Sequence, residues 1–394
     1  MYVLFFCSFL LVKSYYFTVH PLEKRIAYVF GIKKIHYLDT RTLNDLEELF
    51  QYYPLLIFKG LDNNISPTNF IDFVKNFDRN HDTEALTNPE LYQHQMLQLF
   101  DQFPDCKHVA PRGNIELSNF HHIKNIKIKP YDPFINNYLW HTDILGHEYK
   151  LPNVVTGFYI IDQPLIGGDT DFISGETIYE KLNVEEQNAC QNILIKINRR
   201  KFITNSLQID YAGVNRLEDF EERYDGNTCL PLVYAPDNID NIYEKPRILI
   251  MPTFLENVVG WSIKDSREWI KNFMNNKVLP HRISIQWKKG DLAVFNNRRF
   301  IHSSTPARNY LDNGDSSKRL LLQTFIPTNK PLLAYRPSPN NVYACYNVGW
   351  IKDQEISIIS AHNNIKFAND IITKNNETVN DDNIYSLYKK NNTS

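Results

Sequence analysis

The segment Trp140-His141-Thr142-Asp143 constrains this chain more than any other, because it holds two metal-ligating side chains two residues apart. On a β-strand, side chains at this spacing leave the same face, so an imidazole and a carboxylate can occupy adjacent positions around one ion. A candidate for a third ligand, His302, lies far downstream in the segment 291–302. Runs rich in β-branched and aromatic residues at 154–161 and 292–295 predict strands close to both histidines.

Two His and one carboxylate form the facial triad of non-heme Fe(II) oxygenases, which leaves three metal positions open for a co-substrate and oxygen. The alternative for His141 is a core histidine bonded to a backbone carbonyl. A zinc hydrolase or a cupin-type metal protein is a further alternative. The adjacent pair His121 and His122 would point to opposite faces of a strand, which argues against joint metal binding by them.

Two further motifs favour the oxygenase interpretation. Gly167-Gly168-Asp169-Thr170 follows the first histidine, and Arg319 follows His302 by 17 residues. Arg319 precedes a run of three leucines that predicts a buried strand, where an unpaired charge is costly. An arginine suits a carboxylate partner because its planar fork binds in a bidentate way and keeps its charge. The alternatives are a turn threonine at 170 and a surface arginine at 319.

On these motifs, together with Gln286-Trp287, Gly290-Asp291 and Asn297-Arg298, the chain resembles the taurine/alkylsulfonate dioxygenase (TfdA-like) family from about Lys34 to Pro327. The resemblance implies an α+β, mainly β fold with a double-stranded β-helix (jelly-roll) core and flanking helices. It also implies roles for five residues: His141, Asp143 and His302 as Fe(II) ligands, and Thr170 and Arg319 as the groups that hold the distal carboxylate of 2-oxoglutarate.

The expected function is therefore an Fe(II)- and 2-oxoglutarate-dependent dioxygenase. Such an enzyme uses O2 to hydroxylate a small organic substrate, with succinate and CO2 as co-products. The alternative is a catalytically degenerate member that binds a ligand or a partner. That alternative is disfavoured, because no position of the triad is lost in this sequence.

The substrate is less well defined by the sequence. Sulfonate-cleaving members of the family carry a second arginine four residues after the co-substrate arginine, where this chain has Gln323. A neutral amide cannot supply a charge-assisted bond to an anion. We therefore expect taurine to be a poor substrate, unless a replacement cation comes from the segments 79–120 or 197–245 or from Arg308. Asn137 matches a substrate-contacting asparagine of the sulfonate enzymes, and its alternative interpretation is a loop cap.

Composition excludes one class of partner. The chain has 394 residues, a net charge of -2 and a pI of about 6.6, so it offers no basic field for a nucleic-acid backbone. We expect a small-molecule substrate, no nucleic acid, no membrane span and, as an open possibility, a homo-oligomer.

The cysteines bear on the compartment. Five widely spaced cysteines without a Cys-x-x-Cys motif predict a reducing, cytoplasmic setting, with secretion through the apolar N-terminus as the alternative: Cys7, Cys106, Cys190, Cys229 and Cys345.

The expected layout has three parts. Residues 1–20 form an apolar leader, residues 21–362 a single oxygenase domain with an insertion near 197–245, and residues 363–394 a polar, flexible tail. Apolar periodicity predicts helices at 43–52, 67–77, 92–100, 175–195 and 266–274, and strands at 55–58 and 283–287. The rest of 79–120 is expected to be irregular.

Overall fold

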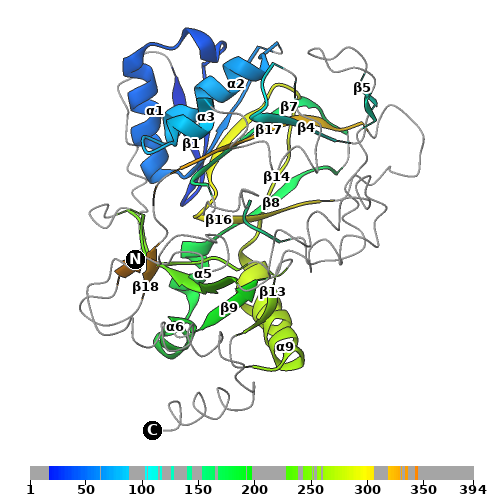
Figure 1. Cartoon of the computed structure of the whole chain (residues 1–394). Coiled ribbons are helices and arrows are strands. Elements are labelled where there is room, and N and C mark those ends of the chain that lie inside the picture. The colour runs from blue at the N-terminus through cyan, green and yellow to red at the C-terminus, as the bar shows by residue number, and fades with distance from the viewer. Residues whose placement is uncertain are drawn as a thin grey trace, which may run out of the picture.

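The computed structural model describes residues 17–62, 64–87, 103, 105–113, 116–117, 126–127, 140–143, 153–164, 167–191, 193–197, 228–237, 243–250, 252, 255–258, 261–305, 318–328, 330, 333–335 and 342–344. These residues form a mixed α/β structure built on large sheets. Figure 1 shows helices above the largest sheet, a smaller sheet below it, and further helices beneath that.

A seven-stranded sheet dominates the structure. Its strands run in the order β1 (Thr18–Glu23), β2 (Ile26–Phe30), β3 (Leu55–Phe58), β15 (Leu292–Asn296), β7 (Val155–Asp162), β17 (Leu320–Ile326) and β4 (Val109–Gly113). Every neighbouring pair is antiparallel except β2 and β3, which are parallel. The strands β3 and β15, which are far apart in the chain, therefore lie side by side near its centre.

Helices cover one face of this sheet. They are α1 (Thr40–Tyr52), α2 (Pro67–Val74) and α3 (Thr83–Thr87), with short 3-10 turns at η1 (Ile35–Tyr37) and η2 (Lys75–Phe77). The side chain of Asp39 caps α1, and that of Ser66 caps α2, each accepting from a backbone N–H of the first turn. The apolar stripes of both helices pack on alternate residues of the strands, such as Val155, Tyr159 and Leu322.

The opposite face of the large sheet packs on a second, three-stranded sheet. Its strands run in the order β14 (Ile283–Ile285), β8 (Thr170–Ser174) and β16 (Phe300–Ser304). A separate core cluster joins the two sheets, with Phe158 and Leu321 from the large sheet meeting Phe172 and Phe300 from the small one. This space between the sheets contains the candidate site.

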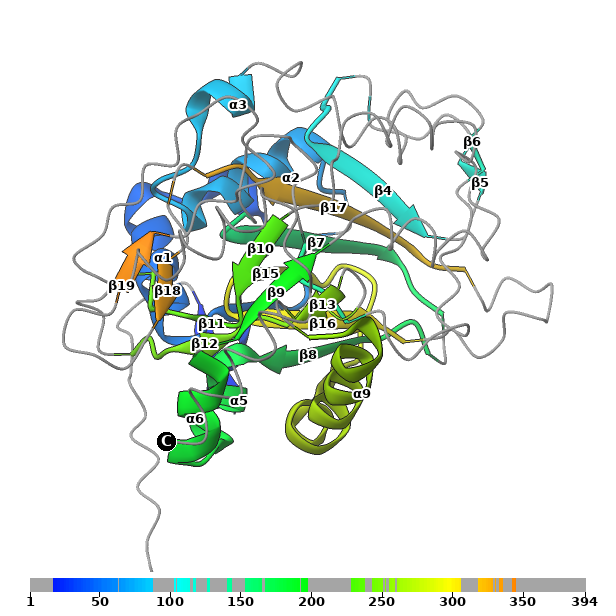
Figure 2. The same cartoon turned by 60° about the horizontal axis from the view of Figure 1, so that its bottom comes forward.

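Further helices lie beyond the small sheet (Figure 2). They comprise the helices α5 (Gly175–Lys181), α6 (Val184–Gln191) and α9 (Ile263–Phe273), with η5 (Met274–Val278) and η6 (Leu279–His281) after α9. Two further sheets run β10 (Thr228–Pro231), β9 (Leu194–Ile197), β13 (Leu255–Val258), and β12 (Arg247–Ile248), β11 (Val233–Tyr234), β18 (Leu333–Tyr335), β19 (Val342–Ala344). A hairpin pairs β5 (Glu116–Leu117) with β6 (Ile126–Lys127).

Most of the expected elements that fall on described residues are present. The helix expected at 43–52 begins earlier, at Thr40, because Asp39 supplies its cap. The strand at 55–58 and the helix at 67–77 are confirmed as β3 and as α2 with η2. The strands expected near the two histidines are β7 and β15. The helix expected at 266–274 is α9, and the strand at 283–287 ends at Ile285.

Three expectations were wrong. The helix at 175–195 is two helices, α5 and α6, followed by β9, because the segment Leu182–Asn183 ends the first helix and caps the second. The segment 79–120 is not irregular throughout, because it contains α3 and the edge strand β4. The large sheet also begins with β1 at Thr18, so residues assigned to an apolar leader already take part in pairing. The helix expected at 92–100 and the tail at 363–394 lie outside the described residues.

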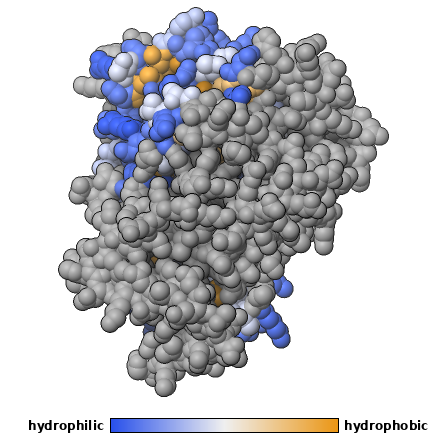
Figure 3. Space-filling view, viewed as in Figure 1, coloured by the Kyte–Doolittle hydropathy of each residue, from blue (hydrophilic) through white to orange (hydrophobic). Residues whose placement is uncertain are grey.

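The solvent-facing side of α1, α2 and α3 is mostly hydrophilic, with a small hydrophobic area among polar residues (Figure 3). This distribution fits helices whose apolar stripes face the large sheet. Within the described part of the chain, no helix is both long and apolar enough to cross a bilayer.

The close approach of α2 to β7 depends on Gly157. A Cβ at this position would lie 2.7 Å from the Cγ2 of Val74, a buried branched side chain that cannot swing away. We expect Gly157→Ala to lower the free energy of unfolding by about 1–3 kcal/mol through overpacking. The urea midpoint and the Tm should both fall, while Ser284→Ala, at an exposed strand position, should leave them unchanged. An unaltered midpoint in Gly157→Ala would show that α2 moves away at no cost.

Candidate metal centre

Two backbone hydrogen bonds bring the expected ligands together. The N–H of His141 donates to the carbonyl of His302 over 3.1 Å, and the N–H of His302 donates to the carbonyl of His141 over 2.9 Å. The two residues therefore form an isolated antiparallel bridge at β16. Residues opposite each other in such a bridge carry side chains on the same face, so both imidazoles point to the same side.

The side chains of His141, Asp143 and His302 form a compact cluster between the sheets. One ligand atom from each lies within 4.8 Å of the others. The Nε2 of His141 lies 3.6 Å from Asp143 Oδ1, and the Nε2 of His302 lies 3.6 Å from Asp143 Oδ2. These distances are too long for hydrogen bonds. Ligands at about 2.1 Å from one ion would lie roughly 3 Å apart, so small movements suffice to close this set around a metal.

The protonation states expected in this cluster suit metal binding. Burial lowers the pKa of His302 to about 3, with His141 adding to the effect and Asp143 opposing it. Burial raises the pKa of Asp143, but His302, His141 and Arg112 together outweigh burial and leave that pKa below its usual value. At neutral pH the cluster therefore presents a neutral imidazole at His302 and a carboxylate, which are the forms that coordinate metals.

Aromatic rings fix the orientation of His302. The ring of Phe172 stacks on the imidazole at 5.8 Å, while the rings of Phe158 and Phe295 meet it edge-on at 5.9 and 5.2 Å. The three rings come from β8, β7 and β15, so both sheets contribute to the enclosure. They leave the Nε2 of His302 directed toward Asp143.

Three polar residues hold Asp143, and the sequence analysis gave none of them this role. The side chain of Asn297 accepts from the N–H of Asp143 at 2.8 Å and donates to its carbonyl at 2.6 Å. Asn153 in turn accepts from the amide of Asn297 at 3.0 Å. The hydroxyl of Thr156 donates to Asp143 Oδ2 at 3.2 Å. The Asn297-Arg298 motif was the one signal in the sequence that pointed to this support.

The turn between β15 and β16 connects the site to the rest of the fold. After Asn297, Arg298 donates to the carbonyl of Lys330, and Arg299 donates to the carbonyl of Gln51 at the end of α1. Arg299 also pairs with the buried Glu176 of α5, with 2.8 Å between Nε and Oε1. The motif found in the sequence is thus an anchoring turn, with one residue directed at the site and two directed away from it.

Thr170 lies at the start of β8 with its side chain buried. Gly167 and Gly168 precede it with φ values of 78° and 71°, a left-handed backbone that glycine adopts at no steric cost. The hydroxyl of Thr170 accepts a hydrogen bond of 2.9 Å from the indole N–H of Trp287. Because a hydroxyl can both accept and donate, the proton of Thr170 stays available for an anionic ligand. Trp287 therefore orients Thr170 in addition to packing in the core.

Arg319 immediately precedes β17, on the other side of the space between the sheets. Its charge acts on Asp169, the residue before Thr170. Burial and Asp171 raise the pKa of Asp169, and Arg319 opposes that rise. Burial lowers the pKa of Arg319 to about 10, so the guanidinium remains charged at neutral pH. Arg319 therefore lies close enough to the start of β8 for its charge to act on Asp169.

Gln323 is buried on β17, directly opposite Phe158 of β7. Its Oε1 accepts a hydrogen bond of 2.6 Å from the Nε of Arg112 on β4. Arg112 is half-buried and was not singled out from the sequence. Asn137 and Arg308, which were considered as substrate contacts, lie outside the described residues.

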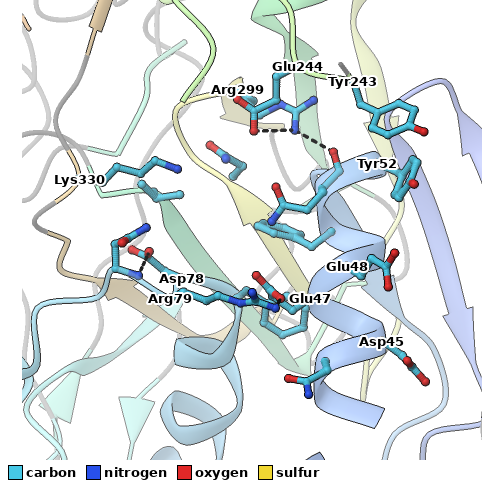
Figure 4. A pocket seen from close by; sticks show the side chains of 17 residues that line it. Asp45, Glu47, Glu48, Tyr52, Asp78, Arg79, Tyr243, Glu244, Arg299 and Lys330 are labelled. Atoms are coloured by element: carbon cyan, nitrogen blue, oxygen red, sulfur yellow. Dashed lines mark hydrogen bonds and ion pairs between the residues drawn. The ribbon is translucent and has the colours of Figure 1, made fainter. Parts of the chain in front are cut away.

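A separate cavity of about 630 Å³ lies between α1 and the turn after β15. Its described lining includes none of the triad residues. Figure 4 shows Arg299 facing Glu244, and Glu47 beside Arg79, so charges of opposite sign meet along its wall. The cavity adjoins the anchoring turn and not the metal centre.

A family model described as taurine catabolism dioxygenase TauD, TfdA family matches residues 18–325. The chain belongs to this family. Family membership confirms the expected enzyme class, an Fe(II)- and 2-oxoglutarate-dependent dioxygenase, and extends the matched region upstream of Lys34 to β1. No curated protein matches the chain in sequence.

Solved structures support the fold. A crystal structure of AAD-2 in complex with Mn(II) and N-oxalylglycine is 15% identical, with a TM-score of 0.56, and the match covers 80% of this chain and 98% of that one. A putative alpha-ketoglutarate-dependent taurine dioxygenase from Burkholderia xenovorans is 16% identical, with a TM-score of 0.57, over 84% and 98%. A putative alpha-ketoglutarate dependent 2,4-D dioxygenase from the same organism is 16% identical, with a TM-score of 0.52, over 79% and 97%.

The hydroxyl of Thr156 offers a test of how Asp143 is held. We expect Thr156→Val, which keeps the shape of the side chain, to weaken Mn(II) binding by roughly 10-fold or more, because groups that orient metal ligands typically contribute this much. Thr324→Val is the matched control, since it removes another buried hydroxyl that donates to the carbonyl of His108. Mn(II) titration of both variants decides the question, and equal affinities would contradict a positioning role for Thr156.

Proposed function

We propose that His141, Asp143 and His302 hold Fe(II), and that the enzyme hydroxylates a small organic substrate with release of succinate and CO2. The observation that carries the proposal is the convergence of the three ligand atoms within 4.8 Å in a member of this family. The three residues occupy one face of the metal position and leave the other face for ligands. All three ligand positions are retained, so a degenerate binding protein is not favoured.

We propose that Thr170 and Arg319 bind the distal carboxylate of 2-oxoglutarate. Arg319 supplies a fixed positive charge, and Thr170 supplies a hydroxyl donor whose acceptor side is already used by Trp287. Iron with 2-oxoglutarate and O2 supplies the oxidising chemistry when bound. The protein orients these ligands and surrounds His302 with Phe158, Phe172 and Phe295, which keeps water away from that side of the centre.

The fold that we propose for this chemistry is a double-stranded β-helix. The support is the apposition of the large sheet and the β14-β8-β16 sheet through one apolar cluster, with the triad between them. We further propose one oxygenase domain over residues 21–362, extended upstream to include β1.

A cytoplasmic location is proposed because Cys106 and Cys190 are both free and buried.

The metal site is tested by removing its ligands one at a time. We expect His141→Ala, Asp143→Ala and His302→Ala each to abolish succinate formation from 2-oxoglutarate and to weaken anaerobic Fe(II) binding strongly, because two ligands hold the ion poorly. His36→Ala is the control, since this histidine is exposed and distant in the fold. Unchanged Fe(II) affinity in His302→Ala would contradict the assignment.

The co-substrate site is tested at Arg319. Losing a charged contact to a buried carboxylate costs about 2–5 kcal/mol, so Arg319→Ala should raise the 2-oxoglutarate concentration needed for half-maximal turnover roughly 30-fold or more. Fe(II) binding should stay intact. The neighbouring Lys318→Ala is the control, because that side chain is exposed. A requirement within about twofold of wild type in Arg319→Ala would show that another cation holds the carboxylate.

A further inference from the structure

We propose that Phe172 is a positioning residue, which holds the imidazole of His302 in its metal-binding orientation in place of a hydrogen-bond acceptor. The proposal rests on the proposed function and deepens it, because it assigns how one ligand of the metal is fixed. A histidine that binds a metal through one ring nitrogen almost always donates the N–H of the other to a carboxylate, a carbonyl or water. That hydrogen bond fixes the tautomer and the orientation of the ring. His302 departs from this pattern.

The second ring nitrogen of His302 has no acceptor within the described part of the chain. Its Nε2 is directed toward Asp143, while its Nδ1 is buried and has no hydrogen-bond partner there. Asp143 has the opposite kind of support, because Asn297 and Thr156 hold it by hydrogen bonds. The carboxylate of the cluster is thus fixed by polar partners, whereas the imidazole of His302 must be fixed by packing.

Strand pairing places Phe172 against this imidazole. In the register of β8 with β16, His302 lies directly opposite Phe172. Directly opposite residues on neighbouring strands carry their side chains on the same face, close enough to interact. The two rings stack, with 5.8 Å between their centroids and an angle of 26° between their planes. Because any other plane of the imidazole would break this stacking, the ring of Phe172 selects one orientation for His302.

Two further rings limit the movement of the same imidazole. Phe158 on β7 and Phe295 on β15 meet it at interplanar angles of 67° and 70°. These two rings also contact each other, with 5.2 Å between their centroids, so they support one another. Stacked and edge-on arrangements are the ones that aromatic rings prefer. All three phenylalanines are buried, and their side chains carry no hydrogen-bonding oxygen or nitrogen.

This arrangement has two consequences for metal binding that can be separated by experiment. Removing the stacked ring of Phe172 should weaken metal binding, because the imidazole of His302 can then leave its ligating plane. Removing the N–H of the imidazole should not weaken it, because no acceptor is lost. A histidine fixed by a hydrogen bond would show the reverse behaviour.

The first experiment measures Mn(II) affinity by calorimetry, so that no turnover is needed. Phe172→Leu should weaken Mn(II) binding roughly 3- to 10-fold, which corresponds to the loss of one aromatic contact. Phe300→Leu is the matched control. Phe300 is buried in the same core cluster and packs on Phe172 at 6.0 Å, but it makes no ring contact with His302 among the described residues. It should lower the Tm to a similar extent and leave Mn(II) affinity within about twofold of wild type.

The second experiment replaces the side chain of His302 by a free ligand. His302→Gly should bind Mn(II) weakly, and added imidazole should restore binding by entering the space beside Phe172. N-methylimidazole should restore binding equally, because it lacks the N–H and can place its methyl group where Cβ was. With Phe172→Leu in the same background, roughly 3- to 10-fold more imidazole should be needed. Wild type titrated in the same imidazole concentrations corrects for metal bound by imidazole in solution.

The proposal is overturned if Phe172→Leu binds Mn(II) as wild type does, or if Phe300→Leu loses as much affinity as Phe172→Leu. It is also overturned if neither ligand restores binding to a folded His302→Gly, or if imidazole does so and N-methylimidazole does not. The latter result would show that an acceptor, such as a buried water, fixes the ring. If His302→Gly does not fold, the two phenylalanine variants decide. Tight Mn(II) binding by His302→Gly without imidazole would instead contradict the proposed function itself.

Discussion

The pair of backbone hydrogen bonds between His141 and His302 is the constraint on which the site depends. These two residues are far apart in the chain, yet their N–H and carbonyl groups satisfy each other at 3.1 and 2.9 Å. The bridge sets the distance and the common direction of both imidazoles before any metal is considered. Asp143, two residues from the first histidine, is then placed by the alternation of an extended backbone. A local pattern and one long-range pairing together produce the triad.

The turn from Asn297 to Arg299 makes that arrangement rigid. Asn297 brackets the backbone of Asp143, while Arg299 is anchored to Glu176 and to the end of α1. Glu176 is fully buried and also pairs with Arg25, near the start of β2. A buried carboxylate shared by two arginines is expensive to disrupt, because removing one partner leaves an uncompensated charge. Ion pairs thereby join the N-terminal hairpin and α5 to the turn whose Asn297 holds Asp143 by hydrogen bonds.

On the face of the large sheet that packs on the β14-β8-β16 sheet, neighbouring strands supply different parts of the site. β7 contributes Thr156 to hold Asp143 and Phe158 to enclose His302, while β17 and β4 contribute Gln323 and Arg112. The hydrogen bond between Arg112 and Gln323 joins the edge strand β4 to β17 on this face of the sheet.

The sequence by itself predicted the candidate pair His141 and Asp143 and the main strands and helices of the core, because these depend on local spacing and periodicity. The co-substrate residues to consider, Thr170 and Arg319, came from the resemblance to the family. His-x-Asp predicts two ligands on one face, and the capped, apolar-striped segments fold as α1 and α2. Tertiary structure decided the features that arise from contacts between segments far apart in the sequence. Three features depend on neighbours that no local pattern predicts. They are the split of 175–195 into two helices and a strand, the contribution of β1 and β4 to the sheet, and the support of Asp143 by Asn297. The same is true of the hydrogen bond between Arg112 and Gln323, because the pairing of β4 with β17 sets these two side chains close together.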